Sequence, residues 1–244
     1  MLVVYASRHD ATAQALVARW AEHDAALLTA ADLSVAGWRY HLDSPDDSTA
    51  IVSGRRVEAR RISGVLIRWP FVHERELSHI IPEDRAYVAS EMFAFLLGWL
   101  TQLKCPVLNR PTPTNLLGPS WRHEQWIHTA AKLGIRVRPA RRHVRMHAPH
   151  TPDEQSQMSS ASQTTVIVVG DESFGANNPL LDAYARRLAR AAGVGLLAVY
   201  FDGDGADAAL TGANLWPELV DDEVIDAVLA HLLRPSHAES SGGR

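Results

Sequence analysis

Cysteine is nearly absent from this chain of 244 residues. Cys105 is the only one, so an internal disulfide is excluded and a reducing compartment is expected. A nucleophilic thiol would need a histidine partner, and twelve histidines make chance neighbours common. We therefore interpret Cys105 as a structural residue.

Long apolar runs are also missing. No run reaches the roughly 18 residues that a membrane span needs. The apolar residues at 2–6 follow no charged segment and are too few for a signal sequence. We expect a cytoplasmic protein without a membrane contact.

Charge is small overall but unevenly distributed. The net charge of −4 gives no general indication of nucleic-acid binding. Residues 125–152 contain one lysine, five arginines and no acid, whereas residues 191–233 contain many acids and no lysine or arginine. This pattern predicts one basic and one acidic part of the surface.

The stretch 64–139 alternates between strand and helix patterns. Residues 65–67 form a short apolar run typical of a buried strand, and residues 84–103 have apolar side chains at helical spacing. A strand at 106–109 and a helix at 124–133 follow. Such alternation predicts an α/β fold with a parallel sheet and crossover helices.

Further elements are predicted on both sides of this stretch. Before it we expect strands at 2–6, 26–28 and 38–42, a helix at 12–22, and a hairpin of residues 49–52 and 55–59 at the sheet edge. After it we expect a hairpin beginning at 166, helices at 180–192 and 221–233, and strands at 194–201 and 208–215. Residues 151–164 are polar, rich in Ser and Gln, and lack periodicity, which is typical of a linker.

Four short motifs resemble the ATP-grasp proteins. The chain is similar to the carboxylate-amine ligases that modify peptides, including graspetide maturases and glutamate-adding ligases. The resemblance rests on the order of the segments VLIRWP (65–70), VLNRP (107–111), AAKLGIRVRP (130–139) and VVGD (168–171).

The resemblance implies an ATP-grasp-like α/β fold whose central lid subdomain is shortened or absent. It divides the chain into a pre-ATP-grasp α/β domain, a connecting part with the basic segment, a linker in place of the lid, a reduced C-terminal α+β lobe and a disordered tail. The corresponding bounds are 1–110, 111–147, 148–164, 165–234 and 235–244.

The resemblance also shows where this chain departs from the family. The lid position, residues 140–165, contains no lysine. Tyr200 aligns with an acid that binds Mg²⁺, and Gly212-Ala213-Asn214 aligns with the Glu-x-Asn of the next strand, so only Asn214 is retained. His123, beside Arg122, aligns with a nucleotide-binding lysine. Asp202 and Asp204 are near, but Asp-Gly-Asp-Gly is more typical of a tight turn.

Two functions remain open at this point. In the first, the protein is a pseudoenzyme that binds no cofactor and serves a peptide-modification (natural-product, RiPP) pathway as a binding or accessory component. In the second, it is an active ATP-dependent carboxylate-amine ligase with a minimal lid. ATP and Mg²⁺ would then be bound with the help of His123, Arg122 and Asn214.

The expected partner is an acidic peptide or a partner modifying enzyme. The residues predicted to contact it are Arg68, Trp69, Arg136, Arg138, Arg141, Arg142 and Arg145. Nucleic acid is disfavoured because no aromatic residues are interleaved with the arginines. We predict no metal site at His143, His147 and His150, where Pro149 interrupts a helix. The apolar face of residues 84–103 suits a homodimer.

Overall fold

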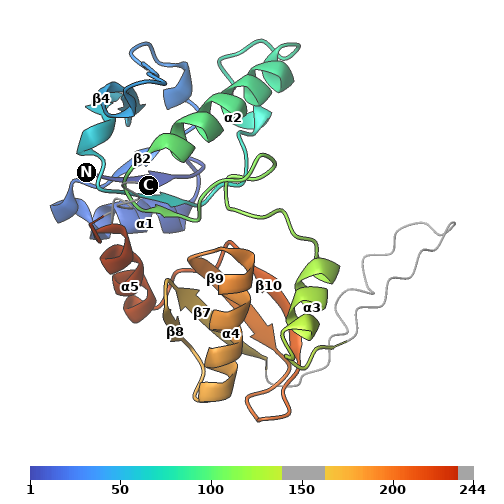
Figure 1. Cartoon of the computed structure of the whole chain (residues 1–244). Helices are drawn as coiled ribbons and strands as arrows, with labels where there is room; N and C mark the ends of the chain where they lie inside the picture. Colours follow the sequence, from blue (N-terminus) through green and yellow to red (C-terminus); the bar gives the residue numbers. More distant parts are fainter. Residues whose placement is uncertain (139–162, 236–244) are drawn as a thin grey trace, which may run out of the picture. The chain divides into compact units, whose positions relative to one another are not determined.

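A computed structural model of the chain describes residues 1–138 and 163–235 (Figure 1). Its residues form two compact units. Unit 1 comprises Met1–Ser120, Val194–Leu196 and the part from Glu218 onward, and unit 2 comprises Trp121–Gly193 and Leu197–Pro217. Most of the predicted linker and the tail after residue 235 lie outside the described residues.

A four-stranded parallel sheet forms the centre of unit 1, as predicted. Its strands lie in the order β2-β1-β5-β6. Their bounds are Leu2–Tyr5 (β1), Ala26–Leu28 (β2), Gly64–Ile67 (β5) and Val107–Leu108 (β6). Every residue of β1 and β5 is buried, which explains why these strands are continuous apolar runs.

Helices cover both faces of this sheet. α1 (Ala11–Arg19) and α2 (Arg85–Gln102) lie on opposite sides of it (Figure 1), and α5 (Asp222–Leu232) packs against β5. The Asp10 carboxylate begins α1 by accepting a hydrogen bond from Ala13 N. α2 buries Leu96, Trp99 and Leu100, in agreement with the periodicity of its sequence.

The predicted hairpin of unit 1 is confirmed, but its predicted place at the sheet edge is wrong. β3 (Thr49–Val52) and β4 (Arg55–Glu58) pair with each other as a separate two-stranded sheet. Ser53 and Gly54 turn the chain with φ values of 49° and 70°, because a two-residue hairpin turn requires positive φ.

The strand predicted at residues 38–42 does not form. Arg39 makes one isolated bridge to Thr49. The Trp38 indole donates to Asp32 O at 2.8 Å, and its ring lies 5.4 Å from that of Trp99. The aromatic residues that made this segment look like a strand instead pack on α2.

Short 3-10 helices complete unit 1. They are Ala21–His23 (η1), Asp32–Ser34 (η2), Pro45–Asp47 (η3), Ala59–Arg61 (η4) and Glu74–Glu76 (η5). Within 1–138 and 163–235, no helix is both long and apolar enough for a bilayer crossing.

Unit 2 contains an antiparallel sheet with the strand order β10-β9-β7-β8. The strands are Thr164–Val169 (β7), Glu172–Phe174 (β8), Leu196–Phe201 (β9) and Leu210–Asn214 (β10). α4 (Pro179–Ala192) packs on β7 and β8, while α3 (His123–Lys132) packs on β10. The hairpin, strands and helix predicted here are confirmed.

Candidate functional site

The C-terminal edge of the parallel sheet is the first candidate site. β1 is followed by Ser7 and Asp10, and β5 by Arg68. The chain runs from β1 to β2 on one side and later to β5 on the other, so the strand order reverses at β1. Open α/β sheets bind ligands at such a point.

Arg68 is already paired at this edge. Its Nε donates to Asp10 Oδ2 at 2.9 Å, and the two side chains are only 5% and 8% exposed. The other Asp10 oxygen holds the first turn of α1. The predicted role of Arg68 in peptide binding therefore lacks an accessible guanidinium, because the charge serves to join β5 to α1. The neighbouring Trp69 is half-buried.

The loop after β5 is held by a second set of hydrogen bonds. Ser7 Oγ donates to Glu76 Oε1 at 2.6 Å, and Tyr5 Oη donates to Phe71 O at 3.2 Å. Burial raises the pKa of Tyr5, with a smaller contribution from the Glu76 charge, so this hydroxyl stays protonated. The polar groups at the edge thus fix a loop within unit 1.

Asn109, at the end of the VLN motif, also has a structural role. Its Oδ1 accepts from Gly195 N at 2.8 Å and Leu196 N at 2.7 Å, and its Nδ2 donates to Leu196 O at 2.8 Å. These residues all belong to unit 1. The buried amide ties the end of β6 to the start of β9.

The second candidate site lies on one face of the unit 2 sheet. Gly212 on β10 pairs with Tyr200 on β9. A Cβ atom added at Gly212 would lie 3.5 Å from His123 Nδ1, at the start of α3. The structure therefore brings together Tyr200, Gly212 and His123, three positions that the resemblance placed at a nucleotide or metal site. The adjacent Arg122 is exposed.

Asn214, the retained member of Glu-x-Asn, is bonded to its own turn. Its Nδ2 donates to Trp216 O at 2.9 Å and its Oδ1 accepts from Trp216 N at 3.0 Å. Both polar atoms of the amide thus have a partner within two residues. Asn214 is exposed, and a nucleotide or metal ion would have to use the second lone pair of Oδ1 or the second hydrogen of Nδ2.

The Asp-Gly-Asp-Gly segment is a turn, as its composition indicated. Asp202 Oδ1 accepts from Ala209 N at 2.7 Å, and Asp202 Oδ2 pairs with Arg138 at 2.8 Å. Arg136 donates to Asp207 O at 3.2 Å. These two arginines of the basic segment bind an acidic turn of their own unit, and Arg141, Arg142 and Arg145 lie outside the described residues.

The described residues contain no ready metal cluster. Between residues 1 and 138 and between 163 and 235, no group of three or more His, Cys, Asp or Glu side chains is arranged to hold a metal ion. The histidines at 143, 147 and 150 lie in the segment that is not described.

Comparison with known proteins shows similarity in structure alone. No protein-family profile matches the sequence, and no curated protein does. The macrocyclase MdnC from Microcystis aeruginosa MRC, solved with the precursor peptide MdnA, is similar with a TM-score of 0.66 and 11% identity, over 96% of this chain and 99% of that chain.

Two further solved structures agree with this result. The ATP-grasp ligase PsnB, solved with a minimal precursor, has a TM-score of 0.64 and 11% identity over 94% of this chain and 98% of its own. A RimK domain ATP-grasp protein from Sphaerobacter thermophilus DSM 20745 has a TM-score of 0.51 and 16% identity over 96% and 99%. The chain therefore has the ATP-grasp fold that its motifs predicted.

Proposed function

We propose that this protein is a peptide-binding, non-catalytic component of a peptide-modification pathway. Peptide binding is supported by the similar proteins, since PsnB and MdnC are both described in complex with precursor peptides. In this proposal the ATP-grasp fold is kept as a scaffold and Mg·ATP is not bound.

One observation carries the non-catalytic part of the proposal. The positions that the resemblance assigns to metal ligands hold Tyr200 and Gly212, and the retained Asn214 is hydrogen-bonded to Trp216. Mg²⁺ needs several oxygen ligands, mainly carboxylates and phosphate oxygens. Phosphoryl transfer depends on this cation to neutralise charge in the transition state. Without a carboxylate at either strand position, this face lacks the ligands that would hold Mg²⁺ and therefore the charge neutralisation that the cation provides.

The proposed contact for an acidic partner is the arginine-rich segment. Arg136 and Arg138 lie beside the 202–208 turn and are partly exposed, and the sequence adds Arg141, Arg142 and Arg145. Trp69 in unit 1 is a further proposed contact. Arg68 is left out because it is buried against Asp10.

The alternative is an active carboxylate-amine ligase. It is favoured by the position of His123 beside Gly212, and by the structure of PsnB with a minimal precursor, Mg and ADP, which has a TM-score of 0.63 and 12% identity. In this alternative, Arg122 and His123 would contact phosphate, and Asn214 would contact the metal.

Calorimetry with Mg·ATP separates the two functions. We expect no saturable heat at millimolar nucleotide. Micromolar binding that is lost in Asn214→Ala but kept in Asn177→Ala would establish the ligase function instead. Asn177 is a suitable control because it is exposed and has no hydrogen bond within the described residues.

A further inference from the structure

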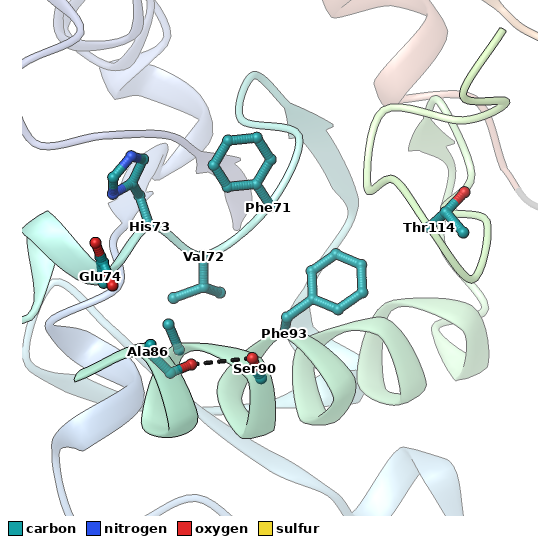
Figure 2. Close-up of a pocket in the computed structure, with 9 residues that line it drawn as sticks. Phe71, Val72, His73, Glu74, Ala86, Ser90, Phe93 and Thr114 are labelled. Atoms are coloured by element: carbon teal, nitrogen blue, oxygen red, sulfur yellow. Dashed lines mark hydrogen bonds between the residues drawn. The ribbon is translucent and has the colours of Figure 1, made fainter. Parts of the chain in front are cut away.

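A cavity of about 510 Å³ lies in unit 1 beside the loop that follows β5. One wall is formed by Phe71, Val72 and Glu74, and the other by Ala86 and Phe93 of α2 (Figure 2). The lining residues of α2 recur at three- and four-residue spacing, so they form one stripe along the helix. The cavity is thus a groove between a loop and a helix of the same unit.

The groove is apolar at its base and exposes aromatic surface. Val72 is 6% exposed, while Phe71 is 45% exposed. Beyond the lining, Ile81 and Tyr87 are 61% and 68% exposed. An exposed aromatic side chain such as Phe71 at a concave apolar surface is typical of a binding site for another apolar group.

Unpaired carboxylates accompany this apolar surface. Glu74 lines the groove, Glu83 and Asp84 immediately precede α2, and Glu91 lies in the second turn of α2; the last three are exposed. None of the four carboxylates has a hydrogen bond or ion pair within 1–138 and 163–235.

The groove offers both kinds of hydrogen-bonding group: His73 has Nε2 as a donor, because its Nδ1 accepts from Arg75 N at 3.1 Å, whereas Glu74 and Ser90 favour a donor on the ligand. Arg85, beside these acids, donates to Ile80 O at 2.8 Å and Ser78 O at 3.3 Å, which reduces its capacity to pair with them. The Ser90 hydroxyl in the groove donates to Ala86 O at 2.9 Å (Figure 2), so its oxygen can still accept. The Glu74 carboxylate is also an acceptor. A ligand here would therefore combine an apolar group with positive charge.

We propose that this groove binds a short peptide segment in which an aromatic or large aliphatic side chain stands next to Lys or Arg. The apolar side chain would enter between Phe71 and Phe93, and the basic side chain would meet Glu74. This inference deepens the peptide-binding part of the proposed function by naming a surface and a kind of segment. It is separate from the acidic partner proposed for the arginine-rich segment.

Selection from a random ten-residue peptide library against the full chain tests the proposal. We expect enrichment of peptides that place an aromatic residue, Leu or Ile within about two positions of Lys or Arg. A labelled synthetic peptide of the enriched sequence is then used in fluorescence anisotropy. Enrichment of acidic peptides alone would support the arginine-rich segment and overturn the groove proposal, and so would the absence of any enriched peptide that combines an apolar with a basic residue.

Two alanines of α2 provide a matched pair of variants. Ala86 and Ala94 are both exposed on this helix, but only Ala86 lines the groove. We expect Ala86→Trp to lower the affinity for the peptide by about tenfold or more. Ala94→Trp should change that affinity by less than about twofold. An equal effect of the two variants would contradict binding in the groove.

A second pair tests the charge. We expect Glu74→Gln to lower the affinity for the selected peptide by about threefold to tenfold, and to make that affinity less dependent on salt. Glu22→Gln removes an exposed carboxylate elsewhere in unit 1 and should leave both unchanged. If Glu74→Gln leaves the peptide affinity and its salt dependence unchanged, the proposal of a basic residue in the peptide is refuted. The peptide measurements do not depend on the Mg·ATP titration. The groove proposal and the proposed non-catalytic function can therefore fail independently.

Discussion

The Asn109 amide makes three hydrogen bonds to the backbone of Gly195 and Leu196 and is 3% exposed. Removing it would leave two backbone N–H groups and a carbonyl without this partner in a buried place. A buried group without a partner costs about 1–3 kcal/mol, so the effect of one substitution is large.

We therefore expect Asn109→Ala to lower the free energy of unfolding by about 2–4 kcal/mol. Urea denaturation measures the change. Asn177→Ala, at an exposed position, should lie within about 0.5 kcal/mol of the wild type. Equal stability of the two variants would mean that the Asn109 amide does not hold the end of β6 to Gly195 and Leu196 within unit 1.

Cys105 illustrates a different effect of burial. Burial raises the pKa of its thiol from 9.0 to about 11, although the backbone and Arg110 act in the opposite direction. The thiolate is the reactive form. The structural interpretation of this cysteine agrees with a thiol that stays protonated at neutral pH.

At pH 8 we expect alkylation of Cys105 by iodoacetamide to be about a hundredfold slower in the folded protein than in urea. Mass spectrometry of the alkylated chain gives both rates. Between pH 9.0 and about 11 the unfolded chain releases this proton while the folded chain keeps it. The free energy of unfolding should therefore decrease over that range as pH rises. Similar alkylation rates at pH 8 would contradict the shifted pKa.

At the scale of elements, α5 lies against β5 at a glycine. A Cβ atom added at Gly64 would lie 2.5 Å from Leu232 O and 2.9 Å from Leu232 Cβ. The first atom is backbone, so it cannot move away as a flexible side chain would. The close approach of helix and strand depends on the missing side chain.

Gly64→Ala should consequently lower the free energy of unfolding by about 1–3 kcal/mol through overpacking. Thermal unfolding followed by circular dichroism is the measurement. Gly203→Ala is a suitable comparison, since its added Cβ would meet only Ala208 Cβ at 3.9 Å, and it should change stability by less than about 0.5 kcal/mol. A harmless Gly64→Ala would show that α5 can shift away from β5.

The pairing of charged residues between elements could not be predicted from the sequence. The sequence places its basic and acidic stretches far apart, which indicated separate basic and acidic surfaces. In the fold, Arg138 pairs with Asp202 in unit 2, and Arg19 of α1 pairs with Asp222 and Asp226 of α5 in unit 1. Acids and arginines from distant parts of the sequence are partners within each unit.

For the whole molecule, the two units differ in how the chain builds them. All of unit 2 lies within the continuous segment 121–217. Unit 1 instead needs residues 194–196 and α5 in addition to 1–120. Residues 194–196 provide backbone groups that bind Asn109. α5 provides the Leu232 side chain, which is fully buried.

We predict that the fragment 121–217 folds by itself, whereas the fragment 1–120 does not. A continuous unit with its own core has what a domain requires, and a unit without its last helix does not. Far-UV circular dichroism with thermal melting should show a cooperative transition for the first fragment only. A cooperative transition in fragment 1–120 would mean that α5 is dispensable for unit 1.

The sequence by itself determined the class of fold. Apolar runs at β1 and β5 and helical spacing in α2 predicted the parallel sheet, because burial on one or two faces dictates these local patterns. The order of four short motifs predicted the ATP-grasp fold. The same resemblance predicted that Tyr200 and Gly212 stand at positions of metal ligands.

Only the tertiary structure decided what individual polar residues do. Arg68 and Asn109 are parts of sequence motifs, but their partners, Asp10 and Leu196, are 58 and 87 positions away. The same holds for the groove between the loop after β5 and α2, whose walls combine apolar residues with Glu74 and Ser90 from separate segments. Hydrogen bonds and cavities depend on distances between segments, and local periodicity contains no such distances.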